Sequence, residues 1–367
     1  MRVKLEDVCE RGSSNLKQSD VVEMAGNYPI YGASGYIGNV DFYHQEKPYV
    51  AVVKDGAGIG RTTLHPAKSS VIGTMQYLLP KDNVLPRYLY YVVSYMHLEK
   101  YFTGATIPHI YFKDYKNEKF NLDSLDKQKE IIESLGRCEK VIESRKQELQ
   151  LLDELIKARF VEMFGDPKIN DKCWNSGMIS DFYKVKGGKR IPKGMGYADG
   201  ITAHPYLRAT DMKNETIIDD DIHYIDNEVY EHIKRYTVKG GDIYLTNVGV
   251  NLGMAGVIPD QYDGANLTEN AVKLVPKTEK VIDGRFLAHY INSPGIQVYI
   301  NERKMSVGVP KLAIFRIETM PLLLPPIAIQ MQFVQFCDQV NKSKVKVQKA
   351  LDETQKLFDS LMQQYFG

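Results

Sequence analysis

The residues whose types and spacing come closest to a chemical motif form a glycine-rich stretch, Gly56-Ala-Gly-Ile-Gly-Arg61. A phosphate-binding loop of the Walker type needs Gly-Lys-Ser/Thr at a fixed position, and here Arg61-Thr62-Thr63 is in the wrong register. The sequence carries no S-adenosylmethionine methyltransferase signature, no His-Glu-x-x-His motif, no acidic and lysine residues at nuclease spacing and no evident Ser/His/Asp set. It therefore predicts a binding protein without catalysis, cofactor or metal.

A basic run is the second feature with chemical meaning. Five cations fall within ten positions that contain no acid: Lys184, Lys186, Lys189, Arg190 and Lys193. The net charge of the chain is only +1, whereas a nucleic-acid binder usually has a basic footprint, so any such footprint must be local. The alternative is a solvated surface with segregated charge, since Asp219 to Asp221 collect the opposite sign.

Composition bounds the protein class. Hydrophobic residues make up 43% and charged residues 25%, which is typical of a folded globular protein. Four cysteines lie far apart without Cys-x-x-Cys or histidines at ligand spacing, which argues against disulfides and zinc. The longest apolar stretch, near residues 321–334, is broken by prolines, so we expect no membrane segment and a cytoplasmic location.

A long internal repeat organises the chain. Residues 108–165 recur without a gap as residues 310–367, because Pro108 and Pro310, Gln128 and Gln330, and the two Phe-Gly ends all differ by 202. The repeat predicts two non-identical heads on a matched pair of arms. The expected boundaries are a first head at 1–122, a first long helix at 123–165, a second head at 166–324 and a second long helix at 325–367.

Both arms carry a heptad pattern. The seam positions of the first are 131, 135, 138, 142, 145, 149, 152, 156, 159 and 163, and adding 202 gives those of the second. Such spacing predicts two helices in a coiled coil. Antiparallel pairing, with facing residues summing to about 496, would set Arg145 against Leu351, Lys344 against Leu152 and Arg159 against Cys337, so that each charged head reaches water past an apolar partner.

The register alone leaves parallel pairing open, because it too avoids like charges. A pseudo-twofold relation between the repeats favours the antiparallel pair and would bring Met1 near Gly367. Asp123-Ser124 are expected to cap the first helix, Pro326 to open the second and Gly165 to end the first in a left-handed conformation.

Each head is predicted to mix helices and strands. The first has a strand-like run at Tyr49–Val53, a glycine turn at Asp55–Gly60 and a helical stretch at 86–102. The second has a strand at 242–246, a turn at 247–253 and a helix near 284–303. The likeness between the heads is loose, whereas the likeness between the arms is strict.

Read together, these segments resemble the specificity subunit of a Type I restriction-modification system over essentially the full length. The residues that carry the resemblance are Gly104-Ala-Thr-Ile-Pro108-His-Ile110, its shorter counterpart Gly308-Val-Pro310-Lys-Leu312, then Leu324-Pro-Pro-Ile-Ala-Ile-Gln330, the long helix and the final Phe-Gly. The string Tyr28–Gly38 is similar to those of target recognition domains. The first copy departs from the pattern at Leu122–Gln128, where the Pro-Pro is absent.

The resemblance implies an α+β fold, with two mixed α/β target recognition domains separated by two long helices in an antiparallel coiled coil of pseudo-twofold symmetry. It implies a non-catalytic subunit that binds a bipartite target in double-stranded DNA, one half per head, with the arms as a ruler. The partners would be two methyltransferase subunits and translocating restriction subunits.

DNA sequence is read by Arg, Lys, Asn, Gln and Thr at base edges, and phosphates are held by Lys, Arg and Tyr. On that chemistry the candidate contacts in the first head are Tyr36, Lys54, Arg61, Thr62 and Lys68. In the second head they are Lys189, Arg190, Lys193, Arg208, Asn247 and Asn251. For each, the competing interpretation is an ordinary solvated loop residue.

Two alternatives remain. One is a coiled-coil adaptor with two protein-binding heads, which would not bind random duplex DNA in a salt-dependent way. The other is the recognition portion of a fused restriction enzyme and methyltransferase, whose catalytic motifs would precede residue 1. The start at Met1 with both arms present argues against the second.

Overall fold

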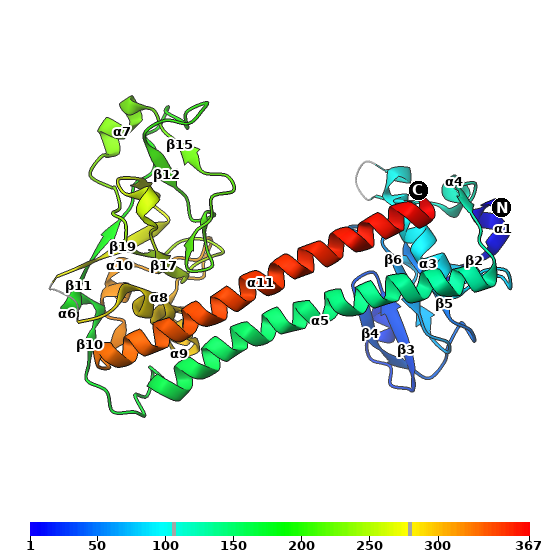
Figure 1. The fold of residues 1–367 in the computed structure, drawn as a ribbon, viewed down its shortest axis with the longest axis horizontal. Helices are drawn as coiled ribbons and strands as arrows, with labels where there is room; N and C mark the ends of the chain where they lie inside the picture. Colours follow the sequence, from blue (N-terminus) through cyan, green and yellow to red (C-terminus); the bar gives the residue numbers. More distant parts are fainter. Residues whose placement is uncertain (105–107, 278–280) are drawn as a thin grey trace. The chain divides into compact units, whose positions relative to one another are not determined.

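The computed structural model describes residues 1–104, 108–277 and 281–367. Residues 105–107 of the first lead-in to the arms lie outside the described ranges. The chain forms two compact units: unit 1 comprises 1–147 and 347–367, and unit 2 comprises 148–346. Both units combine helices with small sheets, which confirms the predicted α+β class (Figure 1).

Unit 1 is built on two sheets. The first has the order β2-β8-β5-β6 and consists of β2 (Cys9–Ser13), β5 (Tyr49–Val53), β6 (Thr62–His65) and β8 (Met75–Pro80). The second has the order β4-β3-β7, with β3 (Tyr28–Gly32) antiparallel to β4 (Gly35–Val40) and parallel to β7 (Ser70–Val71). β1 (Arg2–Lys4) pairs with β9 (Lys119–Asn121). The helices are α1 (Leu5–Val8), α2 (Gln18–Val21), α3 (Pro86–Tyr95), η1 (Leu98–Tyr101) and α4 (Phe112–Tyr115).

The continuous apolar run of β5 follows from burial on both faces. Side chains alternate along a strand, so Val50 and Val52 face the core that contains α3, while Tyr49, Ala51 and Val53 face the core beside the second sheet. All five residues of β5 are fully buried. A strand covered on both sides needs apolar residues at every position rather than at every other one.

Unit 2 repeats the same plan. Its sheets have the orders β11-β19-β16-β17 and β15-β12-β18, and β10 (Ser176–Met178) pairs with β20 (Pro321–Leu323). The strands are β11 (Tyr183–Gly187), β12 (Pro205–Leu207), β15 (His223–Tyr224), β16 (Ile243–Thr246), β17 (Ala255–Val257), β18 (Asn266–Leu267) and β19 (Ala271–Pro276). The helices are α6 (Ile179–Phe182), α7 (Asn227–Ile233), η2 (Asp260–Tyr262), α8 (Gly284–Asn292), α9 (Pro294–Arg303) and α10 (Ile314–Glu318).

Connections between matching strands differ between the two units. In unit 1, β3 and β4 are joined by the two-residue turn Ala33-Ser34. In unit 2 the matching connection, between β12 and β15, carries an added hairpin of β13 (Met212–Lys213) and β14 (Thr216–Ile217). Unit 2 also has α7 between β15 and β16, where unit 1 has no helix. The loose likeness between the head sequences therefore conceals a shared strand topology with different connections.

Two helices of 40 residues each, α5 (Leu125–Phe164) and α11 (Ile327–Phe366), pass through both units. In unit 1, Ile131 near the start of α5 shares a core with Met362 near the end of α11. In unit 2, the ring of Phe164 at the end of α5 lies 5.4 Å from that of Phe333 near the start of α11. Within each unit the helices therefore run antiparallel, as predicted, and every predicted seam position is buried or half-buried.

Charged seam residues find partners close to those predicted. Lys344 Nζ lies 2.5 Å from Asp153 Oδ1, next to the expected Leu152. The guanidinium of Arg159 lies 5.7 Å above the ring of Phe336, next to the expected Cys337. The Nε atoms of Arg145 and Arg159 are buried without a hydrogen bond from the described residues, so these arginines reach solvent only in part.

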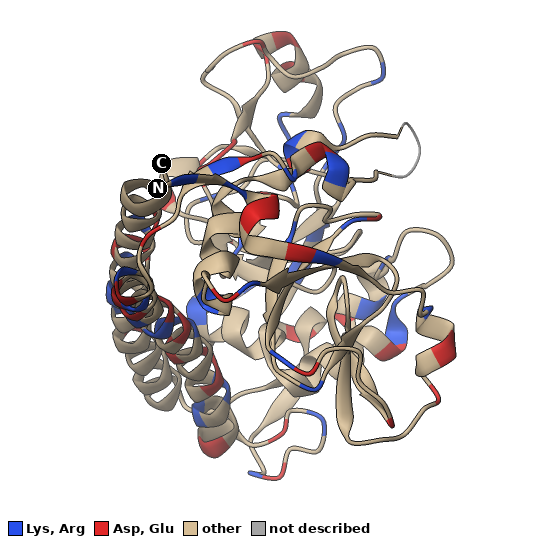
Figure 2. Cartoon of the chain, turned by 90° about the vertical axis from the view of Figure 1, so that its right-hand side faces the viewer, with Lys and Arg blue, Asp and Glu red and all other residues tan. Residues whose placement is uncertain are grey.

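The ends of α5 and α11 agree with the predicted caps, except that α11 begins one residue later than predicted. Ser124 Oγ accepts a hydrogen bond from Lys127 N at 3.3 Å, and Gly165 has a left-handed φ of 74°. Pro326 precedes α11 by one position instead of being its first residue. Both views show the chain ends close together in unit 1, as predicted for Met1 and Gly367 (Figures 1 and 2).

Candidate nucleic-acid interface

A glycine-rich loop follows the central strand of each unit. In unit 1 the loop after β5 contains Gly56, Gly58 and Gly60, with φ values of 87°, 98° and 81°. Only glycine adopts this region without strain. A Cβ at Gly60 would also come within 2.5 Å of the backbone nitrogen of Glu99. The glycines therefore fix the loop's shape.

The repeated segment that precedes each arm, with Pro108 in unit 1 and Pro310 in unit 2, holds this loop in place. We call this segment the lead-in. In unit 1, Gly56 N donates to Pro108 O at 3.0 Å and Ile110 N donates to Lys54 O at 2.9 Å. The same two hydrogen bonds recur in unit 2 at 2.9 Å and 2.8 Å, between Gly249 and Pro310 and between Leu312 and Asn247. The repeat thus extends beyond the arms and fixes the loop backbone in both heads.

Four of the unit 1 candidates gather around the glycine loop. Arg61 Nη1 donates to Ala33 O at 3.0 Å, which ties the loop to the β3–β4 turn. Tyr36 follows that turn with 62% of its surface exposed. Thr62 Oγ1 donates to Gly60 O at 3.2 Å, and Lys54 begins the loop. An exposed tyrosine beside basic side chains suits contact with a phosphate or a base.

The fifth unit 1 candidate, Lys68, belongs to a different segment. Its backbone nitrogen donates to Gln45 O at 2.8 Å, and its ammonium lies 4.0 Å from Glu46. Both side chains are more than half exposed, so this ion pair restrains Lys68 only weakly. The contacts of Lys68 do not join it to the glycine loop.

In unit 2, Gly188 places Lys189 beside β18, an edge strand of the β15-β12-β18 sheet. A Cβ at Gly188 would lie 2.0 Å from Thr268 O, so only glycine allows this approach. Lys189 N then donates to Leu267 O at 2.8 Å, and its ammonium lies 5.8 Å from the centre of the Tyr236 ring. The exposed cation is therefore held by backbone packing and by the ring face.

Arg190 is exposed but paired. Its Nε lies 2.6 Å from Glu269 Oε1, while 78% of the arginine side chain remains exposed. The hydrogen bond that Arg190 donates to Glu269 raises the pKa of Arg190 above its ordinary value. Burial alone would raise the pKa of Glu269, but Arg190 and nearby donors lower it. Lys193, three residues further along, is exposed.

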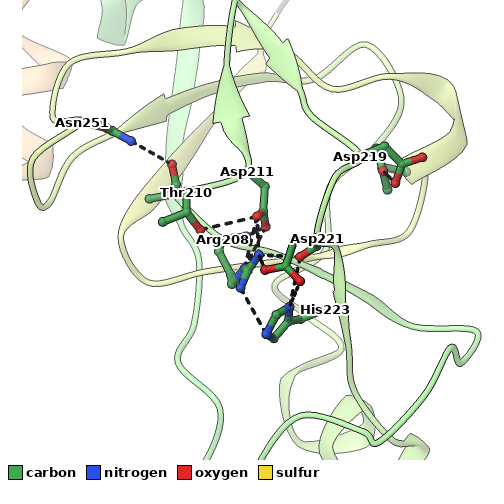
Figure 3. Close-up of polar contacts among 9 residues, drawn as sticks. Arg208, Thr210, Asp211, Asp219, Asp221, His223 and Asn251 are labelled. Atoms are coloured by element: carbon green, nitrogen blue, oxygen red, sulfur yellow. Dashed lines mark hydrogen bonds and ion pairs between the residues drawn. The ribbon is translucent and has the colours of Figure 1, made fainter. Parts of the chain in front are cut away.

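Arg208 is the centre of a polar cluster (Figure 3). Its guanidinium lies 2.7 Å from Asp211 Oδ1 and 3.0 Å from Asp221 Oδ2, and its Nη1 is 3.1 Å from His223 Nε2. The hydrogen bond to Asp211 is the largest cause of a raised Arg208 pKa. Only 21% of the Arg208 side chain is exposed. These contacts commit Arg208 to holding the β12–β15 connection.

The two asparagine candidates differ in access. Asn247 is only 5% exposed, and its Nδ2 donates to Leu312 O at 3.3 Å. Its side chain therefore helps to hold the lead-in against the loop. Asn251 is half-buried, and its Nδ2 donates to Ala209 O at 3.5 Å (Figure 3). A contact of that length leaves Asn251 free to exchange partners. Asn251 therefore keeps the chemistry expected of a base-reading side chain.

Exposed valines beside these loops were not among the residues predicted from the sequence. Val250 and Val307 are each 97% exposed, and Val309 is 65% exposed. An isolated bridge from Val248 to Lys311 brings the two segments together. Apolar side chains contact the methyl group of thymine, so this surface adds candidates for base contact. The sequence signal that could have identified these residues is a valine next to a glycine in an expected turn, as at Gly249-Val250 and Val307-Gly308.

Charge is distributed unevenly along the arms. Figure 2 shows Lys, Arg, Asp and Glu on the two long helices, and α11 carries a basic run, Lys342, Lys344, Lys346 and Lys349, with no acid between Asp338 and Asp352. In the part of the chain that the structure describes, no group of His, Cys, Asp and Glu could hold a metal ion. Within the same ranges, no helix is long and apolar enough to cross a bilayer.

Comparison with known proteins gives consistent matches. The family model described as Type I restriction modification DNA specificity domain matches residues 1–154 and 171–354. The Type I restriction enzyme MjaIX specificity subunit of Methanocaldococcus jannaschii is 23% identical over 315 residues, 78% of this chain and 69% of that protein. The MjaVIII specificity subunit of the same organism is 20% identical over 332 residues, 86% and 73% of the two chains.

Two solved structures share the fold. The S subunit of a Type I restriction-modification system from M. genitalium has a TM-score of 0.59 at 14% identity, covering 100% of this chain and 96% of that one. A chain from a study of complex assembly and conformational transition of the type I R-M system has a TM-score of 0.60 at 13% identity, covering 100% and 97%.

Proposed function

Because the chain belongs to the family of Type I restriction-modification DNA specificity domains, a family of non-catalytic DNA-recognition subunits, we propose that it recognises a bipartite target in double-stranded DNA. Unit 1 reads one half-site and unit 2 reads the other. The chain then directs methyltransferase and restriction subunits to that target in the cytoplasm.

One observation carries the proposal. The same loop, latched by the same two hydrogen bonds, occurs once in each unit, yet the side chains around it differ. Unit 1 offers Arg61 and Tyr36 at the loop, whereas unit 2 offers Asn251 beside exposed valines. Unit 2 adds the cation of Lys189 next to Leu267 and Tyr236. A shared frame with different loop chemistry is what reading two different half-sites requires.

The arms supply the means of spacing the half-sites. Each helix has 40 residues, and a continuous helix of that length is about 60 Å long. That length corresponds to roughly 18 base-pair steps, which is an upper bound on the unread gap. The strict repeat of the arms supports a symmetric role, with one methyltransferase subunit for each repeat.

A surface for these partners is available on α5. Val141, Leu151 and Leu155 lie outside the coiled-coil seam and are 40%, 63% and 46% exposed. Apolar side chains on the outer faces of a helix suit docking of partner helices. This surface supports recruitment of methyltransferase subunits, with the restriction subunits joining for cleavage.

Co-expression with the cognate methyltransferase subunit, followed by mapping of methylated bases, tests the proposal. We expect methylation within two short fixed sequences at one fixed separation. Affinity of the assembled complex for random duplex DNA should also fall steeply as salt rises. Methylation at a single uninterrupted site would contradict the bipartite model, and salt-independent or absent DNA binding would favour the adaptor.

A further inference from the structure

Unit 1 has an open groove along the outer side of strand β6. One cavity of about 490 Å³ lies between β6 and the start of α3, and a second of about 570 Å³ continues along α5. Both are lined by Leu85, Arg87 and Ile132, so they form one continuous groove. We call it the β6 groove and define it by Leu64, Pro66, Leu85, Arg87, Ile132 and Gly136.

Unit 2 has the same groove in the corresponding place. The central strands align because Val50 pairs with Leu64 in unit 1 and Ile243 pairs with Val257 in unit 2. The arms align through the repeat. The matched lining residues are Leu64 and Val257, Pro66 and Pro259, Arg87 and Arg285, Ile132 and Val334, and Gly136 and Asp338.

In unit 2 the chain covers this groove with its own hairpin, β13–β14. Glu215 at the hairpin tip accepts a backbone hydrogen bond from Val257 N at 3.0 Å. Its carboxylate lies 2.8 Å from His289 Nδ1 and accepts from Asn292 Nδ2 at 2.8 Å. The cavity that remains is about 320 Å³. A strand-like segment with a half-buried carboxylate therefore fits this groove geometry.

Unit 1 lacks the covering segment, because its β3–β4 connection has only two residues. β6 is the edge strand of its sheet, and Leu64 occupies the position at which Val257 donates outward to the hairpin. Within residues 1–104, 108–277 and 281–367, no segment outside the sheet bonds to that amide. Exposed edge strands pair readily with extended segments of other chains.

The charge of the groove selects an acidic occupant. Its walls carry four cations, Arg87, Lys129, Arg137 and Lys140, against the single carboxylate Glu133. Arg87 is paired with half-buried Glu139, Lys129 with Asp126 and Arg137 with Glu133. The Lys129 and Arg137 pairs are largely exposed and hold their partners weakly, and Lys140 has no ion pair among the described residues. Half-buried Leu64 and Ile132 supply apolar contact beneath them.

We propose that the β6 groove of unit 1 is a docking site for an extended, acidic segment of a protein partner. The segment adds a strand to β6, sets its carboxylates against the cations of α5, and takes the place that the β13–β14 hairpin has in unit 2. The groove lies outside the loops assigned to DNA, so protein docking and DNA reading are separable.

A cyclic peptide with the sequence Asp211–Ile218 is a suitable probe, since Ile218 N already donates to Asp211 O at 2.8 Å and closes this hairpin. Binding of the labelled peptide to the intact chain is measured by fluorescence anisotropy. Hydrogen exchange at residues 62–65 locates the site. We expect saturable binding with slower exchange in β6, and at least a tenfold loss of affinity for the peptide carrying Glu215→Gln.

Matched variants of the chain complete the experiment. Lys140→Glu should weaken peptide binding at least tenfold, whereas Lys146→Glu, on an exposed part of the same helix outside the groove, should leave it unchanged. Absence of binding, equal binding by both variants, or protection of β6 by random duplex DNA instead of peptide would each overturn the proposal. DNA affinity of the Lys140→Glu chain, measured in parallel, should match that of the parent, and a loss there would overturn the separation of docking from DNA reading.

Discussion

Gln128 and Gln330, which lie 202 residues apart in the sequence, make the same three hydrogen bonds in the two units. Each is fully buried in the first turn of its arm. The Oε1 atoms accept from Leu85 N at 2.8 Å and from Asp283 N at 2.9 Å. The amide groups donate to carbonyl oxygens of Asn83 and Asp123 in unit 1 and of Val281 and Pro325 in unit 2.

These glutamines attach each arm to the start of the neighbouring head helix, α3 or α8. A buried amide must have its hydrogen bonds satisfied, and the surrounding backbone groups depend on it in turn. Gln128→Ala and Gln330→Ala should therefore each lower the free energy of unfolding by about 2–4 kcal/mol. Calorimetry measures the loss, and hydrogen exchange should place it at Leu85 or Asp283.

Exposed glutamines of the same helices are the controls for this prediction. Gln147 and Gln348 bond only to acids one turn away along their own helix. Gln147→Ala and Gln348→Ala should change stability by less than about 0.5 kcal/mol. Equal losses at the buried and exposed positions would show that helix propensity, and not the attachment, is responsible.

Periodic features of the sequence predicted the fold well. The heptad pattern located the seam, and the offset of 202 located two matching arms, because helix packing depends on local spacing. The attachment role of Gln128 was not predictable, since its partners Asn83 and Leu85 lie more than 40 residues away. The shared topology of the heads was also hidden, because β-pairing joins distant segments of divergent sequence.

The candidate DNA-contacting residues show the same limit of sequence-based prediction, because their partners lie far away in the sequence. The sequence identified cations in loops, but it gave no means of pairing Arg208 with Asp221 or Arg190 with Glu269, 79 residues away. Residue type therefore predicted which side chains could bind DNA, whereas only the fold separates structural cations from available ones. The same holds for the neutral candidate Asn247, whose amide is buried against Leu312 O.

Unit 2 should lose stability at high pH through His289. Burial alone would lower the pKa of His289, but its contacts with Cys337 and Glu215 raise it to about 10. The folded-state pKa is above the unfolded value of about 6.5, so the stabilisation is complete below pH 6.5 and is lost as pH rises toward 10. We expect a loss on the order of 3 kcal/mol between these limits, measured by urea unfolding.

His289→Gln should remove most of this pH dependence, because glutamine does not titrate. The variant is expected to be less stable than the parent at pH 7 and to differ from it by less at pH 10. A parent and variant whose stabilities stay parallel from pH 6.5 to 10 would exclude His289 as the titrating group.

Lys193 and Arg208 should respond differently to removal. Lys193 is exposed, so Lys193→Ala should weaken binding to all duplexes about equally, reduce the slope of log affinity against log salt by about 1 and leave stability unchanged. Salt titrations of DNA binding measure this slope. An unchanged slope would mean that Lys193 does not contact phosphate.

Arg208→Ala should instead destabilise the β12–β15 connection, because Asp211 is only 5% exposed and would lose its charged partner. A loss of about 1–3 kcal/mol is expected, together with faster hydrogen exchange in residues 208–223. Arg208→Lys should recover little of it, because lysine lacks the fork that bonds Asp211 and Asp221 together. Full stability with a selective loss of one half-site would reassign Arg208 to base reading.

Lengthening both arms tests their proposed role as a ruler. Seven residues inserted after Lys146 and seven after Lys346 preserve the heptad seam in each helix, since the facing positions shift together. The added rise is about 10.5 Å per helix, or about three base pairs. Methylation mapping should show the unread gap lengthened by about three base pairs and both half-sites unchanged. Insertion in one arm alone breaks the pairing of the seams and should abolish methylation. An altered half-site sequence after the double insertion would show that the arms take part in base reading.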